Sequence, residues 1–412
     1  MAPVSSNSEF FPADKKKRRI DSQQNTTVLD LPNEVLGLSI SLLAAGVDGG
    51  GHFRYGPLAC TAFLRAYLTS VSDSMITSGK SVICSISCAR TYFEDEGTGT
   101  EQLLFFWNNL AKYGHVEVME WGHQQGYSSI WQDSNNGDTV SRNITCSKAA
   151  EYGQLDALIW LKSHGFSWDD GTCDSAARGG HLICLQWAKE HGCPWSEETC
   201  EYAARGGHLS CLRWARQNGC PWDSDTCFAA AEEGHLSCLQ WARLNGCPWD
   251  KDTCSAAARG GNLSCLQWAR ENECPWDEQT CANAARRGHL SCLKWARRNG
   301  CPWNEWTCAC ATEGGHLSCL QWARESGCPW DNGTCWTAAR HGKLSILIWA
   351  RENYCPWDSS TCHAAAEYGH LSCLKYAREN GCQWDEDSYS AAERSGHPEI
   401  LEYVITHGCP KE

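Results

Sequence analysis

The sequence predicts an all-α fold, an elongated alpha-solenoid built from short helical hairpins. Three observations support this: a 27-residue period without slippage, helix-capping residues at one place in each unit, and glycines that end each predicted helix. One aromatic column with this period is Trp160, Trp187, Trp214, Trp241, Trp268, Trp295, Trp322, Trp349, Tyr376 and Tyr403. A second column is Trp168, Trp195, Trp222, Trp249, Trp276, Trp303, Trp330, Trp357 and Trp384. A period of about 20 to 50 residues is typical of solenoids, whose units bury surface only against their neighbours.

The first helix of each unit is predicted to begin after an N-cap residue. In the unit from Trp222 to Gly246, Asp223 follows the tryptophan and can accept a hydrogen bond from a free amide of the first turn. The same position is occupied elsewhere by Asp169, Ser196, Asp250, Asp277, Asn304, Asp331, Asp358 and Asp385. Cys227, Ala230 and Ala231 then form a narrow apolar stripe, which lets neighbouring helices approach closely. Gly234 is predicted to end this helix.

A second helix is predicted from Leu236 to about Arg243, with leucines and alanine on one face. Gly246 stands where a left-handed C-terminal cap is expected, and Pro248 follows where it cannot prolong the helix. Nothing in the unit alternates with a period of two residues, so no strand is predicted. Each unit is therefore expected to be a helical hairpin with a tight connection.

The two tryptophan columns and the cysteines are predicted to be core. At about 25 cal/mol/Å², burying one tryptophan contributes roughly 4–6 kcal/mol before opposing entropy is counted. Of the 29 cysteines, 25 fall into three columns that Cys200, Cys211 and Cys220 exemplify. A zinc site is the alternative, but Ile346 replaces one cysteine of these columns, and isoleucine cannot bind a metal. Reduced, buried packing is therefore favoured, with disulfides between different columns left open.

The unit resembles the ankyrin repeat. The segment Ala230-Ala231-Glu232-Glu233-Gly234-His235, with glycine returning at Gly246, is similar to that family's paired alanines, Gly-His, leucine-rich second helix and closing glycine. Algal, oomycete and giant-virus ankyrin-like proteins with CPW-type repeats look most similar. The unit is shorter than the usual repeat of about 33 residues, and the loss falls where the family places its β-hairpin finger. The resemblance thus implies a nearly all-helical array with cropped fingers.

We predict four regions along the chain. Residues 1–28 form a disordered basic leader, 29–72 an F-box-like or capping helical segment, 73–100 a linker, and 101–412 an array of about eleven units. Trp121 precedes Trp160 by 39 residues instead of 27, which predicts an insertion of about twelve residues near 128–142.

Two motifs precede the array. The basic run Lys15, Lys16, Lys17, Arg18 and Arg19 fits a nuclear-localisation signal, with a solvated tail as the alternative. The start Leu31, Pro32, Val35 and Leu36, with a later helix carrying Cys60, Phe63 and Arg65, resembles the F-box. That resemblance implies docking on the adaptor of a cullin-based ubiquitin ligase. The glycine-rich centre, residues 46–51, departs from the F-box pattern, and the alternative is a helical cap on the array.

Composition and charge exclude several classes of partner. A net charge of −14 argues against a nucleic-acid partner, which needs a clustered basic surface. The best apolar run, Val35 to Val47, is too short to span a membrane, and no apolar stretch follows the N-terminus as a signal peptide requires. We therefore expect a cytoplasmic or nuclear protein. No catalytic group, cofactor or metal site is predicted, because the Cys and His residues recur equivalently in many units.

The irregular positions between the constant columns are the predicted protein-binding residues. They are Phe228, Lys251, Arg259, Arg286, Arg287, Trp306, Trp336 and Arg340. In ankyrin arrays the corresponding first-helix surface lines the concave face, which the resemblance implies here as well. The predicted function is a non-catalytic protein-interaction scaffold, and the alternative is an F-box-like substrate receptor of a ubiquitin ligase. No motif names the partner.

Overall fold

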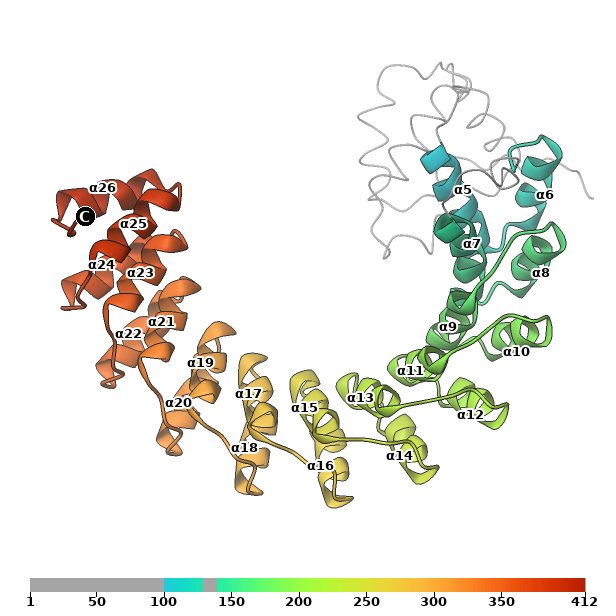
Figure 1. The fold of residues 1–412 in the computed structure, drawn as a ribbon. Coiled ribbons are helices and arrows are strands. Elements are labelled where there is room, and N and C mark those ends of the chain that lie inside the picture. Colours follow the sequence, from blue (N-terminus) through green and yellow to red (C-terminus); the bar gives the residue numbers. More distant parts are fainter. Residues whose placement is uncertain (1–99, 129–138, 412) are drawn as a thin grey trace, which may run out of the picture. The chain divides into compact units, whose positions relative to one another are not determined.

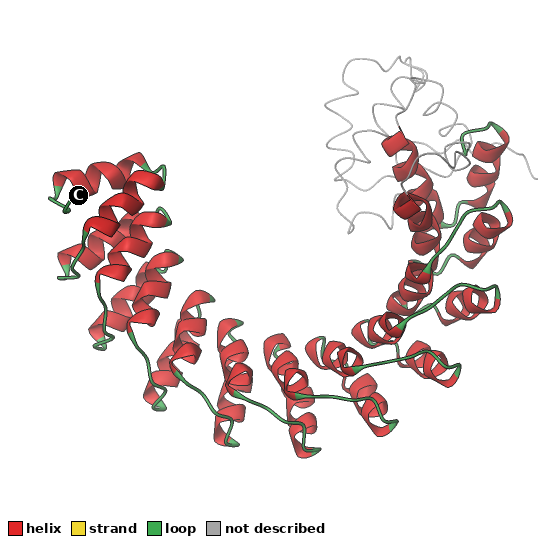
Figure 2. Cartoon of the chain, viewed as in Figure 1, coloured by secondary structure: helices red, strands yellow, loops and turns green. Residues whose placement is uncertain are grey.

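The computed structural model describes residues 100–128 and 139–411, and within them it contains 22 helices and no strand (Figure 2). The chain divides into two compact units, Met1–Gly97 and Thr98–Glu412, and all described helices belong to the second. The predicted all-α class is confirmed for this part of the chain. The basic run Lys15–Arg19, the F-box-like residues Leu31, Pro32, Val35 and Leu36, and residues 129–138 of the predicted insertion lie outside the described residues.

The described helices form successive antiparallel pairs. The first helices are α5 (Thr100–Tyr113), α7 (Thr139–Glu151), α9 (Asp170–Gly179), α11 (Glu197–Arg205), α13 (Ser224–Glu232), α15 (Lys251–Gly260), α17 (Glu278–Arg286), α19 (Glu305–Glu313), α21 (Asn332–Arg340), α23 (Ser359–Glu367) and α25 (Glu386–Arg394). The second helices are α6 (Val116–Gln124), α8 (Leu155–Ser163), α10 (Leu182–Glu190), α12 (Leu209–Gln217), α14 (Leu236–Leu244), α16 (Leu263–Glu271), α18 (Leu290–Arg298), α20 (Leu317–Glu325), α22 (Leu344–Glu352), α24 (Leu371–Glu379) and α26 (Pro398–Thr406).

Within the array the helices form two layers (Figure 1). The odd-numbered first helices pack closely against their neighbours along their length, whereas the even-numbered second helices touch their neighbours sparingly. The first-helix layer accordingly lies on the inner side of the array's curve. The main contacts of each pair are with the pairs beside it, which is the arrangement of a helical solenoid.

All nine predicted caps precede a first helix, and eight of them accept a hydrogen bond from an amide of its first turn, whereas Asp169 before α9 does not. The Asp223 carboxylate accepts a hydrogen bond of 3.0 Å from the Asp225 amide at the start of α13, and Asp250 accepts one of 2.9 Å from Asp252 at the start of α15. Gly246 adopts the predicted left-handed conformation with φ 87°, just beyond α14. From α8 onward the connections between repeats are short: residues 245–250, for example, are the six residues that join α14 to α15, and they contain no strand.

The cysteine columns are buried as predicted, except for Cys409 at the end of the array, and no disulfide joins two cysteines among the described residues. The structure adds a role that the sequence did not indicate. The Cys247 thiol donates to the Asp223 backbone carbonyl at 3.1 Å, and the equivalent thiol in the next repeat, Cys274, donates to the Asp250 carbonyl at 3.2 Å. Each connecting segment is thereby attached to the start of the preceding first helix. A small, weakly polar residue fits this buried position well.

The histidine column links neighbouring repeats. The His235 ring lies against Gly207 of the preceding repeat so closely that a Cβ there would stand 2.5 Å from the ring Nδ1. Where asparagine replaces histidine, Asn262 donates to the Ala231 and Glu232 carbonyls at 3.1 and 2.6 Å. The residue at this position therefore covers the C-terminal end of the preceding first helix and supplies a donor to its free carbonyls.

The expectation that both tryptophan columns are buried core is wrong for most of their members. Trp222 and Trp241 are only half-buried, and they meet edge to face with ring centroids 5.8 Å apart. The Arg216 guanidinium lies 4.5 Å over the Trp222 ring and also donates to the Cys220 carbonyl at 3.0 Å. The array has only two layers of helices, so these rings are covered by each other and by an arginine or lysine instead of by a third layer.

Candidate protein-binding face

The exposed side of the odd-numbered helices, here called the first-helix face, is defined by position relative to the N-cap. Counting from Asp250, the third, fourth, seventh and eighth residues of α15 are Thr253, Cys254, Ala257 and Ala258, all buried in the array. A helix with 3.6 residues per turn then presents positions two, five, six and nine to the opposite side. On α15, Asp252 and Arg259 at positions two and nine reach solvent, whereas Ser255 and Ala256 at positions five and six are covered by the neighbouring helices. The repeats carry different side chains at these four positions.

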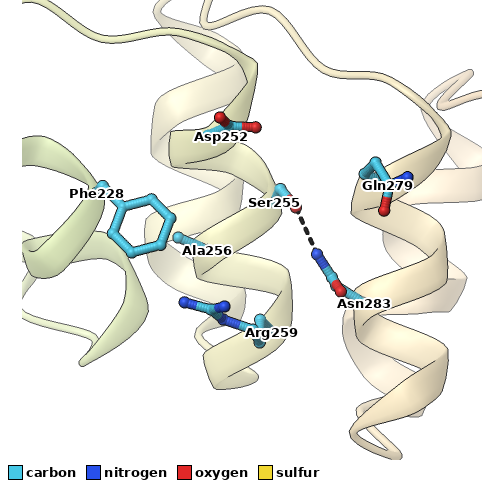
Figure 3. A pocket seen from close by; sticks show the side chains of 7 residues that line it. All are labelled: Phe228, Asp252, Ser255, Ala256, Arg259, Gln279 and Asn283. Carbon is cyan, nitrogen blue, oxygen red and sulfur yellow. Dashed lines mark hydrogen bonds between the residues drawn. The ribbon is translucent and has the colours of Figure 1, made fainter. Parts of the chain in front are cut away.

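A hollow on this face lies over three consecutive first helices (Figure 3). Its lining residues are Phe228 from α13, Asp252, Ser255, Ala256 and Arg259 from α15, and Gln279 and Asn283 from α17. The Asn283 amide donates to the Ser255 hydroxyl at 2.7 Å across the α15–α17 boundary. The Arg259 guanidinium lies 5.2 Å from the centre of the Phe228 ring, whereas the Asp252 carboxylate stands exposed at the other end of the hollow.

Ion pairs join position nine of neighbouring helices. Arg259 contacts Glu232 at 2.5 Å, and Glu232 also lies 3.6 Å from Arg205, so one carboxylate bridges the cations of the repeats on either side. Arg286 contacts Glu313 at 3.0 Å. Half-exposed pairs of this kind contribute only about 0.2–1 kcal/mol each. Their main effect is to hold the guanidinium groups in fixed positions on the face.

The structure brings some of the predicted residues together. Arg340 lies 5.0 Å over the Trp336 ring and 4.9 Å from the Tyr368 ring of the next repeat, so the guanidinium contacts two aromatic side chains. Phe228 and Arg259 share the hollow described above. The predicted residues thus form two separate aromatic–arginine clusters, one near α13–α15 and the other near α21–α23.

The remaining predicted residues stand apart from these clusters. Trp306 on α19 is 49% exposed and has no ring or cation partner among the described residues. The Lys251 ammonium donates to the Asp277 carboxylate at 2.7 Å, and that hydrogen bond raises the pKa of Lys251. Arg287 is exposed just beyond the end of α17. Lys251 is therefore already paired, while Trp306 and Arg287 are open to solvent.

Several residues of the face were missed by the sequence prediction. They are Asp174, Asp252, Ser255, Gln279, Asn283 and Tyr368. All of them occupy the variable positions two, five, six or ten after the cap. Their position within the repeat could therefore have identified them from the sequence. The sequence prediction chose aromatic and basic residues at those positions and overlooked the neutral and acidic ones.

Asp174 has the most strongly perturbed carboxyl group on this face. It is only 6% exposed, and its burial raises its pKa to about 7. The Thr199 hydroxyl of the next repeat donates to it and opposes the shift, whereas the nearby Asp170 and Glu198 carboxylates add to it. The acidic character of α9 and α11 is therefore partly relieved by protonation near neutral pH.

Burial makes the cysteine thiols of the second helices weak nucleophiles, whereas hydrogen bonds with Cys200 and Cys362 lower the pKa of Cys220 and Cys382 in the connecting segments. Burial raises the pKa of Cys211, Cys238 and Cys265 to about 11, which keeps these thiols protonated at neutral pH and weakens them as nucleophiles and ligands. Across residues 100–128 and 139–411, no group of three or more His, Cys, Asp or Glu side chains is placed to hold a metal ion. None of the described helices combines the length and apolarity that crossing a bilayer requires.

Comparison with known proteins adds little to this description. No protein-family model matches the chain, and no curated protein does. One solved structure that matches is the crystal structure of the maize pentatricopeptide repeat protein PPR10, with 14% identity and a TM-score of 0.32. The match covers 92% of this chain and 64% of that one. The ankyrin-like and F-box-like resemblances therefore stay predictions.

Proposed function

We propose that this chain is a non-catalytic protein-interaction scaffold and that its partner binds to the first-helix face. The proposal rests on one observation, that constant and variable residues of the repeat lie on different sides of the first helix. The Thr, Cys, Ala, Gly and His residues that are nearly constant among the repeats pack between helices and between repeats. Positions two, five, six and nine of the first helices, which differ from repeat to repeat, lie on one continuous face.

The side chains on that face suit protein recognition. Tryptophan, tyrosine and arginine supply most of the binding energy in protein interfaces. Trp306 is half exposed and offers an open aromatic surface. Trp336 and Tyr368 hold Arg340 between them, so a partner would meet two aromatic groups whose positions are already restricted. Restricting these side chains before binding lowers the entropy cost of forming the complex.

Site-specific photo-crosslinking tests the proposal. A photoreactive phenylalanine analogue is placed at Trp306 or Trp336, and in a control protein at Leu244, which is 77% exposed at the end of second helix α14. We expect crosslinked partners from both first-helix positions and none from Leu244. Equal crosslinking from all three positions, or crosslinking from Leu244 alone, would contradict the assignment of the binding face.

We propose as a second candidate that the chain is an F-box-like substrate receptor, with an ankyrin-like array holding the target. It rests on the motif at Leu31, Pro32, Val35 and Leu36 and its similarity to adaptor-binding helices. Capture of a ubiquitin-ligase adaptor by the full chain, and loss of capture in a Leu31→Arg, Leu36→Arg variant, would select this function. We further propose that the run Lys15–Arg19 directs the chain to the nucleus.

A further inference from the structure

The hollow of Figure 3 is one instance of a geometry that recurs along the array. It is lined by position five of one first helix, positions two, five, six and nine of the next, and positions two and six of the third. Every first helix in this region starts from its cap in the same way, so these positions recur every 27 residues. The first-helix face therefore presents a row of sites, one per repeat, that have equivalent backbone positions and differ in their side chains. This set of sites is called the row below.

The part of the row over α9, α11, α13 and α15 is acidic. Apart from the N-caps, these four helices carry the carboxylates Asp170, Asp174, Glu197, Glu198, Glu201, Asp225, Glu232 and Asp252. Their cations are Arg178, Arg205, Lys251 and Arg259. Arg205 and Arg259 are paired with Glu232, and Lys251 is paired with the Asp277 cap. Glu198, Asp225 and Asp252 remain exposed and favour a cationic partner.

The part of the row over α19, α21 and α23 carries exposed aromatic side chains beside the charged residues Glu313, Arg340 and Glu367 at position nine. Trp306 and Trp336 project from positions two and five, next to the small residues Ala309 and Gly333 at the matching positions. Tyr368 is 41% exposed just after α23. Small residues beside large rings leave space at the surface for a partner's aliphatic or aromatic side chain.

The spacing of the row limits the conformation of the partner. Packed helices lie about 8–10 Å apart. A polyproline II segment rises about 3.1 Å per residue with three residues per turn, so every third side chain faces the same way at intervals of about 9 Å. In a β-strand, side chains on one face recur every two residues, or about 6.6 Å, which does not match the repeat. An extended segment of the polyproline II type therefore keeps register with successive first helices.

We propose that the first-helix face binds an extended polyproline II segment of the partner, with lysine or arginine at every third position over α9–α15 and apolar side chains at every third position over α19–α23. The eight helices from α9 to α23 would take a segment of about 24 residues. This inference rests on the proposed scaffold function, and it specifies the chemistry and the conformation of the bound partner.

Fluorescence anisotropy with the full chain and labelled synthetic peptides tests this inference. The probe is a 24-residue peptide with lysine at every third position in one half and leucine at every third position in the other, and with proline and serine between. Its reverse sequence is measured as well, because the face does not fix the direction of the chain. The control peptide has the same composition in the same halves, with lysine and leucine at every second position. We expect one direction of the three-residue peptide to bind at least about ten-fold more tightly than the control.

Variants of the protein identify the face that the peptide uses. We expect Glu198→Lys combined with Asp225→Lys, and separately Trp336→Ala, to weaken binding by about ten-fold or more. Glu271→Lys is the matched control, because Glu271 is exposed at the end of second helix α16, and it should leave binding unchanged. Three outcomes would each overturn the inference: equal affinity for the two spacings, an equal effect of the Glu198→Lys, Asp225→Lys protein and of Glu271→Lys, or no binding at about 100 μM peptide.

The outcome is separable from that of the proposed function. If Trp306 and Trp336 crosslink to partner proteins whose crosslinked segments lack basic and apolar residues at three-residue intervals, the scaffold function holds and the present inference fails. If those positions crosslink no more than Leu244, the proposed function fails as well.

Discussion

Asp174 combines burial with a like-charged surrounding. Its carboxyl group is nearly inaccessible, Asp170 and Glu198 lie nearby, and its pKa is about 7 in the folded chain against an ordinary value near 3.8. A carboxyl whose pKa is higher in the folded state binds its proton more tightly there than in the unfolded state. Ionising this carboxyl group in the folded chain therefore lowers the free energy of unfolding. The loss is complete above about pH 7 and disappears as the pH falls toward 4.

We expect Asp174→Asn to stabilise the array at pH 8 by up to about 4 kcal/mol, which is the size of the pKa difference, and to have little effect at pH 4. The asparagine oxygen still accepts the hydrogen bond from Thr199, so the geometry is retained. Urea unfolding of both proteins at the two pH values is the measurement. A gain of the same size at both pH values would show that ionisation is not the cause.

Single residues were predicted well where local chemistry decides their role. The N-cap function of Asp223 and Asp250 follows from their place before a helix, and the burial of Cys247 follows from its recurrence in a small-residue column. Asp174 could not be predicted in the same way. Its burial depends on how α11 packs against α9, and Phe228 occupies the equivalent position in α13.

The helical hairpin depends on two glycines that perform different tasks. Gly207 and Gly219 both have positive φ, 75° and 86°, and follow a first and a second helix respectively. A Cβ on Gly207 would lie 2.5 Å from the His235 ring, whereas a Cβ on Gly219 would meet nothing within 4 Å. One glycine therefore permits contact between repeats, and the other only permits a turn.

We expect Gly219→Ala to cost about 1–2 kcal/mol, from the positive φ alone. Gly207→Ala should cost about 1–3 kcal/mol more, because the added methyl group displaces His235. Denaturant titrations of the two variants measure the difference. In a Gly207→Ala, His235→Ala protein the added methyl group no longer meets the ring, so its effect should fall to that of Gly219→Ala. Equal losses in the two single variants would mean that the His235 ring moves aside freely.

At the scale of the helix, the sequence was informative about boundaries and less so about burial. The first helix was expected directly after Asp223, and α13 begins at Ser224; the second was expected to Arg243, and α14 ends at Leu244. The tryptophan columns were assigned to the core because a regular aromatic column usually marks buried positions. In this array Arg216 and Trp241 cover Trp222, a side-chain arrangement that periodicity does not encode.

The whole array is held together by contacts between adjacent repeats. Its stability is therefore close to a sum of repeat and interface terms, and weakening one interface can separate the unfolding of the two sides. Trp268 on α16 lies near the middle of the array and meets Trp249 edge to face, with centroids 5.7 Å apart. Trp249 lies in the segment before α15, where Arg243 of the preceding repeat covers it, so loss of the Trp268 ring removes support from a contact between repeats on the side where second helices touch sparingly.

We expect Trp268→Ala to cost about 1–3 kcal/mol, less than the 3–5 kcal/mol typical of a fully buried tryptophan, because the ring is half-buried. Calorimetry should show a lower midpoint and a broadened or divided transition. Trp306→Ala is the control, since that ring is 49% exposed and lacks a ring partner among the described residues. A single transition with an unchanged midpoint in Trp268→Ala would show that the two halves are coupled by the first-helix layer alone.

At the scale of the molecule, the 27-residue period was enough to predict a helical solenoid. It did not reveal that Phe228 and Arg259 share a hollow, since they belong to different repeats and meet only after the helices stack. Nor did it show that Glu232 lies between two arginines. Residues that are 27 or 31 positions apart become neighbours through the packing angle of the helices, which the period alone leaves undetermined.

The buried thiols have a consequence for the lifetime of the folded protein under oxidising conditions. While the repeats stay closed, thiols such as Cys211 are protonated and out of reach of oxidants. A repeat that opens exposes several thiols at their ordinary pKa, and oxidation to sulfenic acid or to mixed disulfides then prevents it from closing. In an oxidising medium the lifetime of the folded chain would therefore be set by how often its repeats open. Loss of glutathione would, like heating, shorten that lifetime.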